Sequence, residues 1–542
     1  MTEQDGLLVA DAGGVSVRTA GARLTGPGRQ QLDRAASDGL AASLSAKDPT
    51  LWGPDAEPEA EIRLGWLDAV TTGRALLPEL AALQAALAAE GVDRVVLAGM
   101  GGSSLAPEVI CATAGRPLVV LDTTDPGQVS AALSDLHRTV VVCSSKSGGT
   151  VETDSHRRAA RAAFEAVGVD PSTRIVVVTD PGSPLEAEAR AEGCRAVLLA
   201  DPHVGGRYSA LTAFGLVPAA LAGVDVAALL DDAEAAAASL RSDTGNPALL
   251  LGAVLGGAGL AGLDKVVLAA ADGAPGGFGD WAEQLIAEST GKRGTGLLPV
   301  VVEGPDAPGT APAADTQLVL LGTAPAREGS TAVAGPLGAQ FLVWEYATAV
   351  AGRILGINPF DQPNVAESKD NTRAILEGGE AEPERPALVD GPVEIYASRD
   401  LLAGAGDLAG ALSALLDAVP DRGYLAVMAY LDRTADAATH GVRALLAGRL
   451  AHPVTFGWAP RFLHSTGQFH KGGPQVGAFL QVTGAVARDV EVPGRAYTFG
   501  GLQAAQARGD LRALASRGRP VLRLHLTDRS AGVARLLDAA RG

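Results

Sequence analysis

Hydroxyl side chains, a lysine and a glycine pair follow one another in residues 144–153, SSKSGGTVET, directly after the apolar run TVVVC. Ser145, Ser147 and Thr150 can donate hydrogen bonds around Lys146, and the glycine pair lets the backbone approach a ligand closely. A helix that begins near the second glycine adds unpaired N–H groups and the positive end of its dipole. The combination suits a phosphate monoester. A Ser/Gly turn that only caps the helix explains the same residues, and this stretch alone does not separate the two hypotheses.

A second loop of similar composition, GMGGSSLAP in residues 99–107, also follows an apolar run and precedes a predicted helix. It is a near-match to the dinucleotide-binding fingerprint, with Asp122 at the end of the next strand as the acidic residue. Ser104 stands where the third glycine is needed, so the match is weak. Two hydroxyl-rich loops on neighbouring strands favour one small phosphorylated ligand over a dinucleotide. No segment matches G-x-x-x-x-G-K-[ST], which argues against a nucleoside-triphosphate loop.

Two further residues have types and places suited to catalysis. Arg207 follows a glycine pair in residues 204–215, where the backbone can approach a ligand, although a plain surface arginine explains it as well. Glu288 lies in the last turn of a helix predicted over residues 280–292 and ended by Gly291. The helix dipole disfavours a carboxylate there. On a solvent-exposed face this unfavourable interaction costs little stability. Inside a cleft it would raise the pKa of the carboxylate and make it suitable as a general base.

His464 and His470, two of the eight histidines, lie beside Lys471 in residues 462–474, FLHSTGQFHKGGP. The H-x5-H pair lacks the helical spacing of a zinc motif and no third ligand is nearby, so we expect no metal site. A polar, proline-broken segment, NPFDQPNVAESKDNTR in residues 358–373, lies between two predicted ordered elements. Both segments contain residues that folding alone does not require.

The elements that position these loops are short apolar runs. Five of them, rich in Val and Leu and about 20 to 35 residues apart, are typical of strands buried on both faces and separated by helices. They predict a five-stranded, parallel, doubly wound sheet, which binds ligands at the carboxyl ends of its strands. The runs are residues 94–99, 117–122, 139–144, 174–180 and 195–201.

A second, less regular series of runs predicts a second α/β unit with insertions, closed by a strand and a last helix. These runs are residues 265–270, 297–303, 316–322, 393–398, 424–431, 453–458, 477–484 and 521–528. We therefore expect an α/β fold of two doubly wound parallel-sheet domains with a C-terminal extension. The expected parts are an N-terminal extended and helical segment 1–74, a first domain 75–243, a second domain 244–500 and a C-terminal helix and strand segment 501–542.

Composition limits the function. The 542 residues suffice for about three or four domains. Asp and Glu number 62 against 44 Lys and Arg, a net charge of −18, which argues against nucleic acid or an anionic membrane as a partner. Three scattered cysteines fit a reducing cytosol, and the start MTEQDG has no signal-peptide apolar region. The apolar stretch 248–263 is shorter than a membrane span and predicts a buried helix. We expect a cytoplasmic protein.

Five motifs, in order, resemble the glucose-6-phosphate isomerase family. They are GMGGSSLAP, SSKSGGTVET, GGRYSALTAFG, QLIAESTGK and FDQPNVAESK. RLGWLD and HSTGQFHKGG are similar to stretches in the isomerase half of the transaldolase–isomerase fusion proteins, but the chain is too short to hold a transaldolase barrel as well. The resemblance covers nearly the whole chain. It implies two sugar-isomerase-type (SIS-type) domains and interconversion of glucose 6-phosphate and fructose 6-phosphate.

The resemblance also implies roles for individual residues. Arg207 would stabilise the enediolate, Glu288 would move the proton between C1 and C2, and Lys369 would assist a histidine in opening the sugar ring. None of these steps requires a metal or a redox cofactor. The substrate-binding residues would be Gly102, Ser103, Ser145, Lys146, Ser147, Thr150 and Gln362, with the serine and threonine hydroxyls of residues 145–150 on the phosphate.

The chain departs from the family pattern at several positions. Pro363 and Asn364 stand where the late signature has Trp-Gly, and Ala366 replaces its second Glu. The ring-opening histidine of the family precedes that signature and comes from the neighbouring subunit. Here the similar stretch follows the signature, one residue out of step, so His464 and His470 stay open alternatives. By this resemblance we expect a homodimer whose site is completed across the interface.

Three other functions compete with that of a plain isomerase. A dual phosphoglucose and phosphomannose isomerase is compatible with the sequence. A non-catalytic sugar-phosphate sensor would keep the hydroxyl loops but would not need Glu288, Lys369 and a histidine together. A hexosamine synthase needs a glutaminase domain with a nucleophilic cysteine near its start, whereas the first cysteine here is Cys111, so we discount it.

Overall fold

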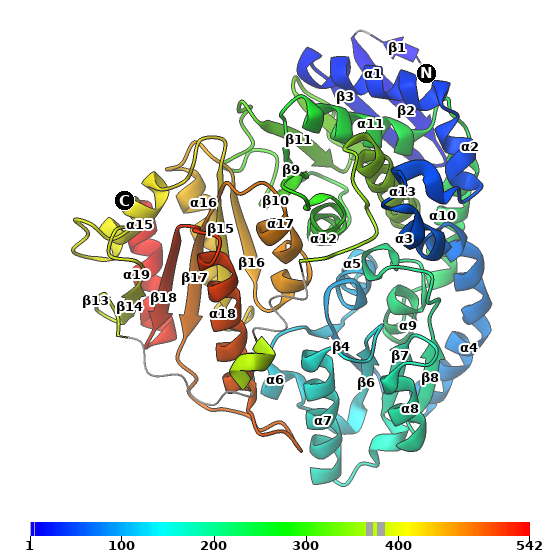
Figure 1. Ribbon diagram of the computed structural model, residues 1–542. Coiled ribbons are helices and arrows are strands. Elements are labelled where there is room, and N and C mark those ends of the chain that lie inside the picture. Colours follow the sequence, from blue (N-terminus) through cyan, green and yellow to red (C-terminus); the bar gives the residue numbers. More distant parts are fainter. Residues whose placement is uncertain (1, 5, 365–371, 377–384) are drawn as a thin grey trace.

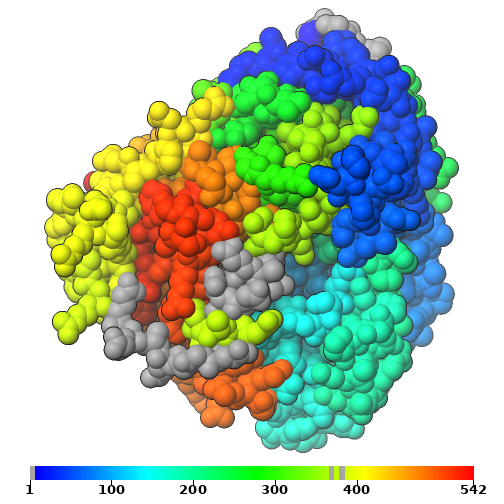
Figure 2. Space-filling model, in the orientation of Figure 1, coloured from blue at the N-terminus to red at the C-terminus, as the bar shows by residue number. Residues whose placement is uncertain are grey.

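The computed structural model describes residues 2–4, 6–364, 372–376 and 385–542. Within this part of the chain the strands form three sheets with helices packed on them (Figure 1). Figure 2 shows the C-terminal unit (residues 388–542), coloured yellow to red, packed against the rest of the chain. Each sheet contains parallel strands, which confirms the mixed α/β class predicted from the sequence.

The first predicted sheet has its five strands, all parallel. Alternate side chains of its central strand enter two different apolar clusters, so both faces are buried. The chain runs from β4 to one edge and from β6 to the other, and the loops after these two adjacent strands therefore flank the switch point where such sheets bind ligands. Across the sheet the strands are β5 (Val119–Leu121), β4 (Arg94–Gly99), β6 (Thr139–Ser144), β7 (Ile175–Thr179) and β8 (Ala196–Leu199).

The N-terminal strands belong to a second sheet of seven strands. They add an antiparallel edge to four strands from the middle of the chain, with β3 pairing to β12. In order the strands are β1 (Thr2–Gln4), β2 (Leu7–Ala12), β3 (Val15–Ala20), β12 (Ser330–Ala334), β11 (Thr316–Leu321), β9 (Lys265–Ala270) and β10 (Leu298–Val302). The predicted buried helix is α11 (Pro247–Leu260), which packs on α13 (Leu337–Ile354).

The second series of apolar runs divides between this sheet and a third one of six strands, a division that the pattern of runs does not predict. The four strands β15 to β18 are parallel, and two antiparallel strands form one edge. In order they are β13 (Leu388–Asp390), β14 (Val393–Tyr396), β18 (Val521–Leu526), β17 (Gly477–Gly484), β15 (Tyr424–Tyr430) and β16 (Val454–Trp458). Helices α15 (Leu408–Asp417), α16 (Gly441–Ala447) and α19 (Arg529–Arg541) share an apolar core with one face.

Seven further elements carry the polar residues discussed below. They are η3 (Gly101–Ser103), α7 (Val151–Ala166), η6 (Gly206–Tyr208), α12 (Phe278–Thr290), η8 (Arg461–His464), α17 (Gly467–Gly472) and α18 (Phe499–Ala515). A helix with the length and hydrophobicity needed to span a bilayer does not occur in the described part of the chain.

Candidate active site

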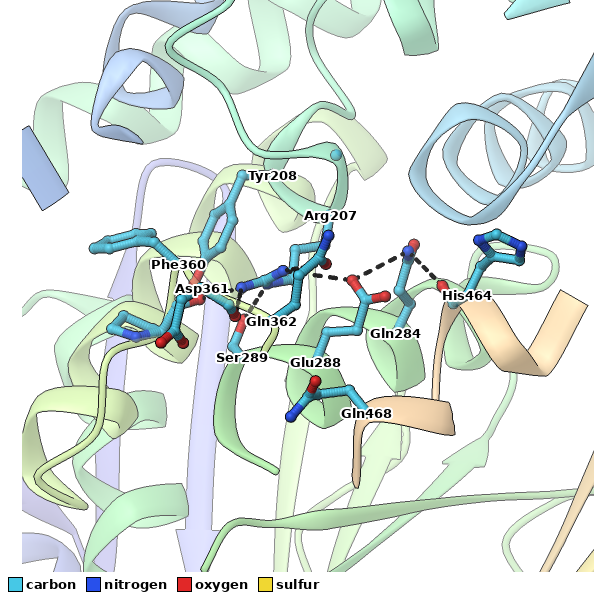
Figure 3. A network of polar contacts seen from close by, with 12 residues as sticks. Arg207, Tyr208, Gln284, Glu288, Ser289, Phe360, Asp361, Gln362, His464 and Gln468 are labelled. Carbon is cyan, nitrogen blue, oxygen red and sulfur yellow. Dashed lines mark hydrogen bonds and ion pairs between the residues drawn. The ribbon is translucent and has the colours of Figure 1, made fainter. Parts of the chain in front are cut away.

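Arg207 is the centre of a buried polar network that joins three parts of the chain (Figure 3). Its Nε donates to Ser289 Oγ at 2.9 Å, and its Nη1 donates to Gln362 Oε1 at 3.1 Å. Its Nη2 donates to the carbonyl oxygens of Pro359 and Asp361, at 2.7 and 2.9 Å. Arg207 is 3% exposed, so it is not a plain surface arginine, and these contacts fix the guanidinium in one place.

Glycines let the loop after β4 pack tightly on the rest of the network. A Cβ on Gly102 would meet the carbonyl oxygen of Gly206 in η6 at 2.0 Å. A Cβ on Gly101, whose φ is +55°, would meet a side chain of α12 at 2.7 Å. Ser103 follows in the same turn and is buried. The contribution of Gly102 is therefore steric, because it brings the loop against the backbone that carries the central arginine.

Glu288 projects from the last turn of α12, and this helix ends at Gly291 as predicted. Its Oε2 lies 3.5 Å from Arg207 Nη1 and 3.4 Å from Gln284 Nε2, one turn earlier in the helix. Glu288 is 5% exposed. The carboxylate therefore lies inside the molecule beside a fixed cation, and not on a solvent-exposed face of the helix.

Gln284 connects this carboxylate to the C-terminal unit. Its Nε2 donates to the carbonyl oxygen of His464 at 2.8 Å, as Figure 3 shows. The Nε2 atom of the His464 ring lies 3.0 Å from Glu152 Oε1, which also accepts from Gln506 Nε2 at 2.7 Å. His464 is thus held by residues of its own chain. The resemblance instead implies that a neighbouring subunit supplies this segment, so the contacts within one chain offer an alternative to that expectation.

Two members of the network were not predicted from the sequence. Glu152 is the next-to-last residue of the motif SSKSGGTVET, but it stands in the first turn of α7, where an acidic residue is ordinary and gives no signal of function. Lys292 Nζ donates to the carbonyl oxygens of Asn358 and Asp361 at 2.7 and 2.6 Å, and to the Asp361 carboxylate at 2.6 Å. Burial, followed by the nearby arginine, lowers the pKa of Lys292 to about 8. Lys292 anchors the turn that also accepts from the central arginine.

The loop after β6 does not use its hydroxyls to cap α7. Thr150 is the N-cap residue, yet its side chain makes no capping bond, and its Oγ1 lies 3.2 Å from Ser145 Oγ. Ser147 is exposed, and its Oγ accepts a backbone N–H of the same loop at 3.3 Å. Lys146 turns to Asp180 in an ion pair. The hypothesis of a turn that only caps the helix loses its support, because the side chain of the N-cap residue makes no capping bond.

A cavity of about 720 Å³ joins this loop to the C-terminal unit. Thr150, Glu152, His464, Arg373 and Gln506 are among the residues that line it. The volume lies in the range of small-molecule sites. The structure therefore brings the hydroxyl loop and one of the two candidate histidines to a shared space.

The second candidate histidine lies elsewhere. His470 is 3% exposed and packs against Tyr424 and Phe479, with its Nδ1 2.9 Å from the Tyr424 hydroxyl. Burial lowers the pKa of His470 to about 3, so its ring is neutral at pH 7. Lys369 lies outside the described residues. Among those that are described, no three His, Cys, Asp or Glu side chains are grouped to hold a metal ion.

One region of the chain, residues 83–294, matches a known protein family. The match is to the phosphoglucose isomerase family model. The matched region includes both hydroxyl loops, Arg207 and Glu288, and it ends before Gln362 and His464. The resemblance to this family, inferred from the sequence motifs, is thereby confirmed for the region that carries the central arginine and glutamate.

Individual relatives agree with the phosphoglucose isomerase match. The chain is 35% identical over 262 residues to the glucose-6-phosphate isomerase of Synechococcus sp. (strain JA-3-3Ab), covering 45% of this chain and 48% of the relative. It is 38% identical over 212 residues to that of Geobacter sp. (strain M21), covering 37% and 40%. The chain thus spans about half the length, or less, of the curated relatives it matches.

Two solved structures share the fold. A hypothetical protein from Thermus thermophilus is 24% identical with a TM-score of 0.55, covering 68% of this chain and 99% of that one. A glucose-6-phosphate isomerase from Chlamydia trachomatis is 17% identical with a TM-score of 0.52, covering 68% of this chain and 89% of that one. At these identities the likeness is one of fold.

Proposed function

We propose that the chain is a glucose-6-phosphate isomerase, which interconverts glucose 6-phosphate and fructose 6-phosphate. The observation that carries this proposal is the buried carboxylate of Glu288, 3.5 Å from the fixed guanidinium of Arg207. Moving a proton between neighbouring carbons needs one group that accepts and returns it. It also needs a fixed positive charge where the enediolate develops. The named activity of the relatives that match the same region supports the same conclusion.

The loop after β6 is the proposed phosphate site. Ser145, Ser147 and Thr150 offer hydroxyls at the N-terminus of α7, whose backbone N–H groups and dipole favour an anion. Phosphate binding there is remote from the reacting carbons, so its binding energy holds C1 and C2 beside Glu288. Lys146 acts on the loop through its ion pair with Asp180 and not on the phosphate directly.

His464 is the proposed ring-opening acid and base. In the proposed tautomer the Nε2–H group of His464 donates to the Glu152 carboxylate. The Nδ1 atom is then free to exchange a proton with the ring oxygen of the sugar. Glu152 is a positioning residue, because it acts through the histidine. Lys369 is proposed to serve at the sugar O1, as the resemblance implies.

The test is a coupled assay in which fructose 6-phosphate is supplied and glucose 6-phosphate is detected by a dehydrogenase. Glu288→Gln should lower the rate by about 10²–10⁴-fold, the usual contribution of a general base. Binding of a sugar-phosphate inhibitor should stay within about tenfold, because the phosphate loop is untouched. Glu165→Gln, an exposed glutamate on α7, is the matched control and should behave as wild type. Retention of more than about a tenth of the activity in Glu288→Gln would overturn the assignment.

Substrate range, assembly and location belong to the same proposal. Mannose 6-phosphate is supplied in a second arm of the assay, and its turnover would extend the activity to a dual isomerase. We propose a cytoplasmic protein, which the three free cysteines support. A homodimer remains our proposal from the resemblance, although the same-chain position of His464 removes the catalytic reason for it.

A further inference from the structure

The face of the six-stranded sheet that packs against α18 is polar at one end. The strand registers place Tyr430 beside Thr483, Thr483 beside His525, and His525 beside Glu394, which forms a row across β15, β17, β18 and β14. The opposite face of the same strands is an apolar core. A sheet face covered by a helix is ordinarily apolar, so this row requires a separate explanation.

Helix α18 covers this row without filling the space above it. It presents the small side chains of Ala504 and Ala507 together with Gln503, Arg508 and Arg512. A cavity of about 580 Å³ remains between the helix and the sheet. It lies at the carboxyl ends of β15, β17 and β18, the edge where parallel sheets bind ligands.

Several polar atoms that line this cavity are unsatisfied. The hydroxyl of Tyr430 and the Nε2 atom of Gln503 have no hydrogen-bond partner among the described residues, although these residues are only 1% and 5% exposed. The Nε of Arg508 is also buried without such a partner. Buried polar groups are nearly always paired, and leaving one unpaired is costly. These groups therefore point to a ligand that pairs them.

The charge of the lining defines the ligand. Arg508, Arg512 and Arg523 face the cavity, against one carboxylate, Glu394, which already accepts from the Tyr396 hydroxyl at 2.7 Å. This excess of guanidinium stands out in a chain whose net charge is −18. Guanidinium groups bind phosphate and carboxylate in a bidentate geometry, with two parallel N–H···O hydrogen bonds. We propose that this cavity is a second binding site, separate from the proposed sugar-phosphate site, for a small organic oxyanion.

Binding is measured by isothermal titration of the full chain with inorganic phosphate and, separately, with citrate. All titrations use Thr150→Asp as background, because the added carboxylate repels anions from the loop at the start of α7. One equivalent of oxyanion should still bind. Arg508→Gln should weaken it at least tenfold, since a charge-assisted bond is lost, and Tyr430→Phe should weaken it about threefold or more. Arg488→Gln, an exposed arginine outside the cavity, should bind as the background does.

Comparing the two probes shows which group the site prefers. Tighter binding of inorganic phosphate indicates a phosphate ligand, and tighter binding of citrate indicates a carboxylate ligand. Two results would overturn the proposal. One is the absence of saturable binding of either probe in the Thr150→Asp background. The other is an unchanged affinity in both Arg508→Gln and Tyr430→Phe. Tyr430→Phe removes only a hydroxyl and keeps the ring packed on Phe462, so it remains informative if the arginine variant does not fold.

Discussion

Two inactive variants of this protein should be unable to rescue each other. His464 contacts Gln284 and Glu152 of its own chain, at 2.8 and 3.0 Å, so each proposed site takes both Glu288 and His464 from one polypeptide. The perturbation is co-expression of Glu288→Gln and His464→Gln in one cell, with a different affinity tag on each. Any assembly that carries both tags is then isolated and assayed beside the unsorted mixture.

The expected magnitudes separate the two arrangements. Loss of a general acid or base lowers the rate by about 10²–10⁴-fold, so each variant alone should retain about 1% of the activity or less. If two chains shared a site, random pairing would make about half of the dimers hybrid, and one site in each hybrid would combine an intact glutamate with an intact histidine. About a quarter of all sites would then work. With both groups from one chain, the mixture should stay at about 1% or below.

The assay is the coupled conversion of fructose 6-phosphate, at equal total protein for each sample. A mixture of each variant with wild-type chain is the control, and its activity should follow the wild-type fraction. Recovery of about a quarter of the wild-type rate in the double-variant mixture would refute the same-chain arrangement. If the chains do not associate, the specific activity of the wild type should also be constant on dilution.

Three further outcomes are expected. Thr150→Asp should weaken sugar-phosphate binding at least tenfold by inhibitor titration, because a carboxylate repels the phosphate, whereas Thr150→Ser should bind nearly as wild type. Gly102→Ala should lower the melting temperature and the activity, since its Cβ would meet the Gly206 carbonyl at 2.0 Å, whereas Gly26→Ala, in a helix with open space around it, should do neither. The buried His470 ring has a pKa of about 3, while the unfolded chain takes up this proton below about pH 6.5, so its contribution to stability is complete above that pH and is lost on acidification. The free energy of unfolding, measured in urea, should fall between pH 7 and pH 5. In His470→Phe this fall should be about 2 kcal/mol smaller than in the wild type.

The sequence predicted the elements better than their partners. The apolar runs located the strands of the first sheet because side chains buried on both faces leave a continuous pattern. The runs at 316–322 and 424–431 have the same character, yet they belong to different sheets, since pairing is set by contacts between residues far apart in the chain. No local pattern distinguishes the two cases.

The sequence also predicted some residues of the candidate site but not all of them. Arg207 and Glu288 were recognised because their types and places served no purpose in folding, and the structure brings them together. Lys292 and Glu152 were missed, because a lysine after a helix and an acidic residue in a first helical turn are ordinary. The proposal of His464 over His470 could not come from the sequence, since it rests on which ring is enclosed by aromatic side chains and which reaches the cavity.

Helix α18 has almost no face on which residues could be substituted without losing a contact. It carries Gln506, on Glu152 of the proposed active site, and Asp510, 2.8 Å from Lys471 of α17. Toward the oxyanion cavity it carries Gln503 and Arg508, and Leu514 lies in an apolar cluster. A helix on the surface of a domain usually keeps a polar half on which substitutions are neutral. Although it lies more than 200 residues beyond the region matched by the family model, α18 should therefore be among the segments least tolerant of substitution in a saturation mutagenesis screen.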